Sequence, residues 1–158
     1  MTSELIETWR MSNEANLFLL GKLPRGSLDA SYGTRTRKVG GQFAHVHSTR
    51  LRWLTHAAPA LAQGVDKFEK GAEPTKAQLT KALKASGKAV EAFLLACEEA
   101  GKVKKWKGSP TTFLGYLVAH EAHHRGLVMV ALRMAGHKLP QEVVYGQWQW
   151  GKTFNQRG

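Results

Sequence analysis

Apolar residues recur every three or four positions along most of the chain, and glycine or proline interrupts this pattern at intervals. Such spacing places side chains on one face of an α-helix, because the helix completes a turn in about 3.6 residues. No segment shows the convincing alternation of apolar and polar residues that is typical of a strand. The pattern therefore predicts four long helices and a short C-terminal helix or irregular tail, over about residues 3–20, 39–63, 75–101, 110–134 and 141–150.

Several ends of these segments carry residues that start or stop a helix. Thr75 and Gln78 fit a capping box, in which a hydroxyl and an amide three residues later bond to free backbone amides. Ser109 and Pro110 suit the N-cap and the first helical position of the next segment. Pro59 lies near the end of the second predicted helix, and we expect it to kink or terminate that helix.

The predicted helices have the number and the lengths typical of an all-α four-helix bundle. The length of 158 residues fits a single domain, 1–158. The first connection, over residues 23–38, is long enough for a crossover, so an up-down-up-down order is not assumed. Gly87 weakens a helix interior by about 1 kcal/mol relative to alanine, which predicts close packing against a neighbour. The C-terminal segment is expected to cover one end of the core with Val143, Val144, Trp148 and Trp150.

Composition excludes several classes of protein. Hydrophobic residues make up 42% of the chain and charged residues 22%, which rules out global disorder. Cys97 is the single cysteine, so a disulfide-stapled fold is excluded, and its apolar neighbours predict an inert core thiol. Charged residues and histidines interrupt the most apolar stretch, 113–135, so no membrane span is predicted. The N-terminus lacks the pattern of a signal peptide, and we expect a cytoplasmic location.

The chain is strongly basic, with 23 lysine or arginine residues, 12 acidic residues and a formal net charge of +11. Basic residues gather over 25–52 and again around Trp106, over 102–107. A basic surface with an aromatic side chain suits a phosphate backbone. The sequence has no zinc-finger spacing, RNP signature or P-loop, so we do not favour nucleic-acid binding. We expect the charge to serve solubility or to attract an anionic small molecule.

Five of the seven histidines fall in two short helical segments. In the fourth predicted helix, His120 and His124 lie one turn apart on one face, where their ring nitrogens can converge on one ion. They belong to an apolar seam that also contains Phe113, Leu117, Leu127, Ala131 and Met134. An unpaired polar ring in such a seam costs free energy. Two hydrogen-bonded core histidines are the alternative, but the pair favours a metal site.

The run His120-Glu121-Ala122-His123 partly matches the metalloprotease signature H-E-x-x-H, but it is one residue too short. His120 and His124 have the one-turn spacing of that signature, whereas Glu121 lies about 100° off the seam. A role for Glu121 as a general base therefore stays open.

A third ligand is expected from the second helix, which carries His45, His47 and His56. Three histidines would leave one coordination position open, as in catalytic rather than structural zinc sites. On a helical wheel, His47 lies at the centre of the apolar stripe, whereas His45 lies with Thr49 and Arg52 on another side. Periodicity alone therefore favours His47.

Three stretches of the sequence, 42–54, 120–126 and 132–137, together resemble one protein family. The second contains H-x-x-x-H-R-G, which is fairly specific when an upstream helix carries a histidine of its own. The resemblance is to the DinB-like superfamily, which also includes the YfiT-type hydrolases. It extends over nearly the whole chain, from Trp9 to Trp150.

This resemblance implies a four-helix bundle, often a homodimer, with a divalent metal held by one histidine of the second helix and two of the fourth. The fourth-helix ligands would be His120 and His124. The family's spacing places the second-helix ligand at His45, against the periodicity argument, and His47 is kept as the alternate. Relatives often have Gln after the H-R-G run, where this chain has Leu127.

The resemblance further implies a metal-dependent enzyme of the thiol-dependent transferase, isomerase or hydrolase type, although many such proteins have no established reaction. The metal would be Zn, Ni or Fe, and it would lower the pKa of a water or activate a thiolate. The partners expected are an anionic thiol or other small-molecule substrate and a second copy of the chain.

A non-catalytic stress-response or binding module is the alternative, and a basic nucleic-acid-binding protein is the less favoured one. No catalytic residue is assigned. Arg50 and Arg52 are candidates for an anion clamp, with a solvated surface as the equal alternative. Arg125 is a candidate to tie its helix to a carboxylate.

Overall fold

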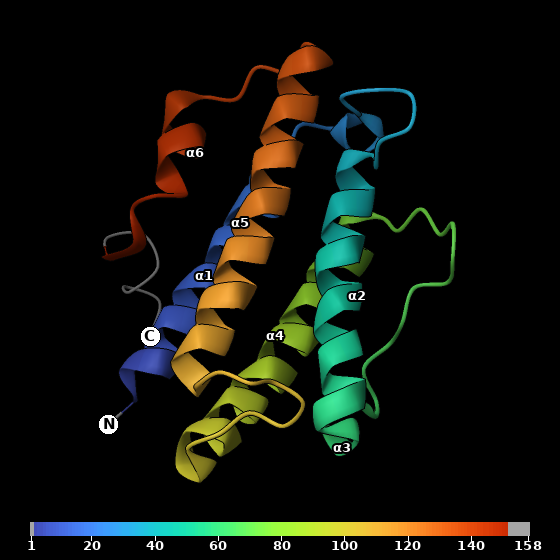
Figure 1. The fold of residues 1–158 in the computed structure, drawn as a ribbon. Helices are drawn as coiled ribbons and strands as arrows, with labels where there is room; N and C mark the ends of the chain where they lie inside the picture. The colour runs from blue at the N-terminus through green and yellow to red at the C-terminus, as the bar shows by residue number, and fades with distance from the viewer. Residues whose placement is uncertain (1, 152–158) are drawn as a thin grey trace.

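The computed structural model describes residues 2–151, which form helices and no strand (Figure 1). The four long helices are α1 (Glu4–Lys22), α2 (Val39–Ala57), α4 (Lys76–Ala100) and α5 (Pro110–Met134). Three shorter elements are the 3-10 helix η1 (Ser27–Asp29), α3 (Pro59–Ala62) and α6 (Gln141–Gly146). The all-α four-helix bundle, with a long first connection and a short C-terminal helix, is confirmed. None of these helices combines the length and apolar character that a membrane span needs.

The helix ends follow the local chemistry of the sequence. The Thr75 side chain accepts a hydrogen bond from the Gln78 amide, and the Gln78 side chain accepts one from the Thr75 amide, so the capping box is formed. Ser109 caps α5, whose first residue is Pro110. Pro59 terminates the second helix and starts the separate helix α3, because its ring cannot continue α2. The predicted continuation of the second helix to residue 63 was therefore wrong.

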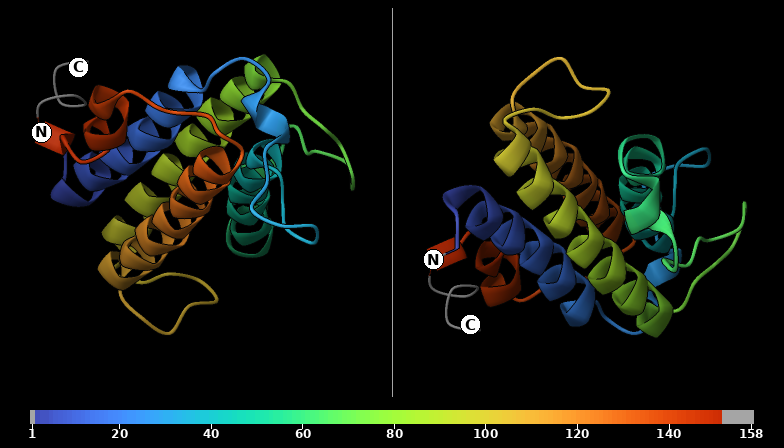
Figure 2. Two further views of the ribbon diagram at one scale, coloured as in Figure 1. Left: turned by 90° about the horizontal axis from the view of Figure 1, so that it is seen from above. Right: turned by 90° about the horizontal axis from the view of Figure 1, so that it is seen from below.

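The order of the helices in space differs from their order in the chain. α1 and α2 each pack against both α4 and α5, so α1 and α2 occupy opposite corners of the bundle (Figure 2). The connection over 23–38 crosses between these corners. In Figure 1, α1 and α5 run in one direction and α2 and α4 in the other. The segment over 58–75 therefore returns along the outside of α2 before α4 begins.

The core consists of two hydrophobic clusters with buried polar residues between them. One cluster includes Ile6, Trp9, Leu54, Leu94 and Phe113. The other includes Leu19, Phe43, Leu83 and Val128. Between them, all four long helices contribute buried polar side chains, here called the polar layer, which comprises Ser12, Asn16, Arg50, Ser86, Glu121 and Arg125.

Gly87 lies on α4 where this helix packs against α1. A Cβ atom at this position would stand 2.5 Å from Asn13 Nδ2, and the Gly87 carbonyl accepts a 2.9 Å hydrogen bond from Trp9 Nε1. The expected close packing is confirmed. Trp9 is 1% exposed and belongs to the core.

Two expectations about exposed faces were wrong. Met134, placed in the apolar seam, is 67% exposed because the last turn of α5 projects beyond α2 (Figure 1). Trp148, expected to cover the core, is 81% exposed, whereas Val143 is buried. The packing of α6 instead brings Gly146 so near the Phe18 ring that a Cβ atom there would stand 2.6 Å away.

Candidate metal centre

Three histidines from two packed helices come together in the bundle. His45 lies on α2, and His120 and His124 lie one turn apart on α5. Their ligand nitrogens all lie within 4.8 Å of one another, and the His45 and His124 ring centroids are 4.6 Å apart. We call these three residues the histidine cluster. Because α2 and α5 pack side by side, residues 75 positions apart meet at one point.

One hydrogen bond fixes the orientation and the tautomer of His124. Its Nδ1 lies 2.7 Å from Oε1 of Gln42, which sits one turn before His45 on α2. An amide oxygen only accepts, so Nδ1 carries the proton and donates. The Nε2 of His124 is then left with its lone pair as the potential ligand atom. Metal-bound histidines generally donate their second ring nitrogen to such an acceptor.

The electrostatic surroundings keep the cluster neutral. Burial lowers the pKa of His45 to about 4, with Arg37 next in effect. Burial and then His120 lower the pKa of His124, also to about 4. The pKa of His120 is lowered as well, mainly by burial. At neutral pH the three rings therefore have free lone pairs, which is the state that binds metals.

The other histidines have different surroundings. His47, favoured by the helical wheel, is fully buried, but its Nε2 lies 2.8 Å from the Asp66 carbonyl oxygen and its ring packs against Phe68. The wheel predicted its burial correctly, but its side chain points away from the cluster. His123 is exposed, and its ring centroid lies 5.1 Å from that of His124. His56 is also exposed, on the last turn of α2.

Glu121 is buried and paired with Arg50, and this argues against a role as general base. Its carboxylate is 1% exposed and accepts hydrogen bonds of 2.7 and 2.8 Å from Nε and Nη2, on one edge of the Arg50 guanidinium. Asn16 donates a third, of 2.7 Å. A carboxylate held by three donors and closed off from solvent is not free to accept a substrate proton. The alternatives weighed for Arg50, an anion clamp or a solvated surface, were both wrong.

The polar layer extends from this ion pair, between α2 and α5, to the two other long helices, α1 and α4. Arg50 donates to the Leu83 carbonyl and the Ser86 hydroxyl on α4, and its guanidinium lies 4.8 Å from the centre of the Trp9 ring. Arg125 donates to Asn16 Oδ1 at 2.7 Å, so it reaches the Glu121 carboxylate through that amide. The layer thus holds α5 in position directly beside His120 and His124.

Sequence reasoning missed Gln42 and the buried position of Arg50, although the sequence carried a signal for both. Gln42 precedes His45 by three residues and so shares its side of the helix. Arg50 falls in the same three-and-four spacing as Phe43, Leu54 and Ala57, all of which are buried. Arg52, in contrast, is exposed and has no hydrogen bond or ion pair within residues 2–151.

The donor set suits a divalent transition metal, because three neutral imidazoles bind Zn, Ni and Fe alike. No curated protein and no solved structure matches the chain significantly. The model of one family does match: it covers residues 1–153 and is described as the DinB family. This match spans the helices that carry all three residues of the histidine cluster. The chain therefore belongs to the DinB family.

Proposed function

We propose that this protein binds a divalent metal through His45, His120 and His124 and uses it as a metal-dependent enzyme. The observation that carries the proposal is the convergence of these three rings, with ligand atoms within 4.8 Å, while Gln42 holds the far nitrogen of His124. Membership of the DinB family supports it independently of the geometry.

Residues around the cluster have separate roles in this proposal. Gln42 fixes the tautomer of His124, and Tyr116 packs beside the His120 ring at a centroid distance of 6.1 Å. Glu121 and Arg50 hold α5 against α2 and do not transfer protons. Arg37 and Arg52, which both act to lower the pKa of His45, present positive charge to an approaching anion.

The number of ligands supports a catalytic metal, and membership of the DinB family suggests the class of reaction. Three protein ligands leave a coordination position open, as catalytic rather than structural zinc sites do. A divalent ion supplies Lewis acidity, which makes a thiol or a water a stronger nucleophile near neutral pH. We therefore propose a thiol-dependent transferase or a hydrolase acting on an anionic small molecule, in the cytoplasm.

The first experiment is metal analysis of protein purified without a histidine tag and without added metal. We expect close to one equivalent of Zn, Ni or Fe for each chain, measured by inductively coupled plasma mass spectrometry. Protein stripped with EDTA should then bind one equivalent in a calorimetric titration. A chain that takes up none of these ions at neutral pH would contradict the proposal.

A second experiment separates an enzyme from a non-catalytic binding module. Metal-loaded protein, EDTA-treated protein and the His124→Ala variant are compared for thiol transfer to an electrophilic aryl halide and for hydrolysis of activated esters. Turnover that is lost in both the EDTA-treated protein and the variant supports the enzyme. Metal binding with equal background rates in all three samples would favour the binding module.

A further inference from the structure

A groove lies between α2 and the segment that returns along it toward α4. It has a volume of about 330 Å³, within the range of small-molecule sites. One wall is the surface of α2 from Ser48 to His56, and the other is the segment with Lys67 and Phe68 that returns along the bundle. His47 holds this segment in place, because its ring bonds to the Asp66 carbonyl.

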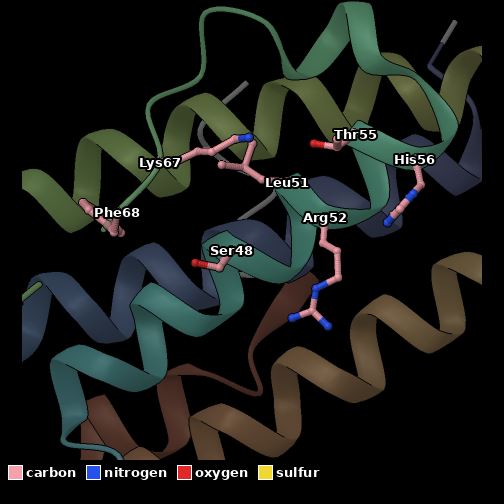
Figure 3. Close-up of a pocket in the computed structure, with 7 residues that line it drawn as sticks. All are labelled: Ser48, Leu51, Arg52, Thr55, His56, Lys67 and Phe68. Atoms are coloured by element: carbon pink, nitrogen blue, oxygen red, sulfur yellow. The ribbon is translucent and has the colours of Figure 1, made fainter. Parts of the chain in front are cut away.

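The groove presents both charged and apolar side chains. Figure 3 shows Lys67 reaching from the returning segment toward Thr55 and Leu51, while Arg52 and His56 leave the other edge of α2 in the direction of α5. Phe68 lies at the far end of the groove.

The groove is positively charged without compensation. No carboxylate lines it, and neither Arg52 nor Lys67 forms an ion pair in the part of the chain that the structure describes. The nearest acid in sequence, Asp66, faces Lys81 on the outside, at 3.7 Å. An unpaired ammonium beside a hydroxyl and an apolar wall matches a ligand with an anionic group on an apolar body.

We propose that this groove is a binding site for a small organic anion. Lys67 and the Thr55 hydroxyl bind the carboxylate, phosphate or sulfonate group, and Leu51 and Phe68 pack against the apolar body. The inference extends the proposed function, because Arg52 lines the groove and its charge also reaches His45 and His120. The groove would thus hold the body of a substrate whose other end lies toward the histidine cluster.

The test uses the full chain in EDTA, so that its result does not depend on a metal. The probe is 8-anilinonaphthalene-1-sulfonate, an aromatic anion whose fluorescence rises on binding, and its uncharged analogue is 1-anilinonaphthalene. The decisive variant is Lys67→Gln, and the matched control is Lys70→Gln, which removes the same charge from the same segment outside the groove. Thermal unfolding verifies that both variants are folded.

We expect the dissociation constant of the anionic probe to rise about tenfold in Lys67→Gln and to change less than about twofold in Lys70→Gln. Thr55→Val should also weaken binding, and the uncharged analogue should bind more weakly than the anion. If both lysine variants lost the same affinity for the anionic probe, the effect would come from net charge alone, and the proposal would be overturned. Equal binding of the uncharged analogue, or no saturable binding, would overturn it too. Neither result bears on the metal, whose uptake by Lys67→Gln should equal that of the wild type.

Discussion

Single side chains decide whether the histidine cluster can hold an ion. We expect His120→Ala and His124→Ala each to abolish uptake of metal, because each variant leaves only two of the three imidazole ligands. His123→Ala is the matched control: this ring is exposed and lies off the shared face, so the variant should keep its metal. Metal content after purification measures all three. If His123→Ala also lost its metal, the effect would come from disruption of α5 rather than from the loss of a ligand.

The two histidines of α2 allow a sharper test, since they are two residues apart and point in different directions. His45→Ala should abolish metal binding, whereas His47→Ala should retain it. The His47 variant should instead lose stability, because the bond to the Asp66 carbonyl is removed from a buried position. Calorimetric titration with Zn²⁺ and thermal unfolding of both variants separate the two roles. The reverse pattern would restore the helical-wheel assignment.

Acidity should affect metal binding at a lower pH than ordinary histidines suggest. A typical imidazole has a pKa near ~6.5, whereas burial lowers the pKa of His45 and His124 to about 4. Protons then compete with the metal only in more acidic solution, so the affinity for Zn²⁺ should change little from pH 8 to about pH 6 and fall steeply toward pH 4. Titrations across this range measure it, and a midpoint near pH 6.5 would contradict the expectation.

The lowered pKa values of His45 and His124 also predict how the stability of the metal-free protein depends on pH. Between about pH 6.5 and 4 the unfolded chain binds protons on these two rings and the folded chain does not. Stability contributed by the neutral rings is therefore present at higher pH and is lost as the pH falls through that window.

The buried ion pair at Glu121 gives a prediction of stability. Replacing Glu121 with Ala leaves Arg50 fully buried without its carboxylate, and breaking such a pair costs about 3–5 kcal/mol. The matched control is Glu91→Ala, which removes the partly exposed partner of Arg10 at the surface and should cost under about 1 kcal/mol. Denaturant unfolding of both variants gives the comparison. Equal costs would show that the polar layer contributes no more than a surface pair.

At the scale of helices, replacing Gly87 or Gly115 with alanine should change the stability of the protein in opposite directions. In Gly87→Ala the new methyl group meets the Asn13 amide at 2.5 Å, so the Asn13 side chain or α1 must shift and the protein should be destabilised. In Gly115→Ala the methyl group meets nothing within 4 Å on the exposed side of α5, so the higher helix propensity should stabilise by about 0.5–1 kcal/mol. Thermal unfolding of both variants tests the signs. A stabilised Gly87→Ala would mean that the contact between α1 and α4 is loose.

Local chemistry explains why the helices could be predicted from the sequence. The caps at Thr75 and Ser109 and the break at Pro59 depend only on neighbouring residues. The pairing of residues within the polar layer could not be predicted, because charged residues default to solvent and Arg125 meets Asn16 across 109 positions. Periodicity identified His47 as buried, but burial did not distinguish a ligand from a hydrogen-bonded core residue. Only the family resemblance pointed to His45.

At the scale of the whole molecule, the exposed apolar residues suggest where a second copy docks. Met134, Tyr145 and Trp148 are each more than half exposed and belong to the C-terminal part of α5 and to the segment after it. We expect a homodimer that covers this surface. Light scattering at micromolar concentration should give twice the mass of one chain, and Trp148→Lys should give one. A wild-type mass near that of one chain would contradict the expectation.

The polar layer also bears on how the metal centre assembles. Sliding α5 along α2 by one turn would move Glu121 about 5.4 Å from Arg50 and leave both charges buried and unpaired. The layer therefore fixes the alignment of the two helices before any ion arrives, and His45 already faces His120 and His124. Such a preorganised centre can exchange its ion while the chain stays folded, unlike a domain that folds only around its metal. For the proposed metal, affinity and cellular supply rather than folding would then select the ion.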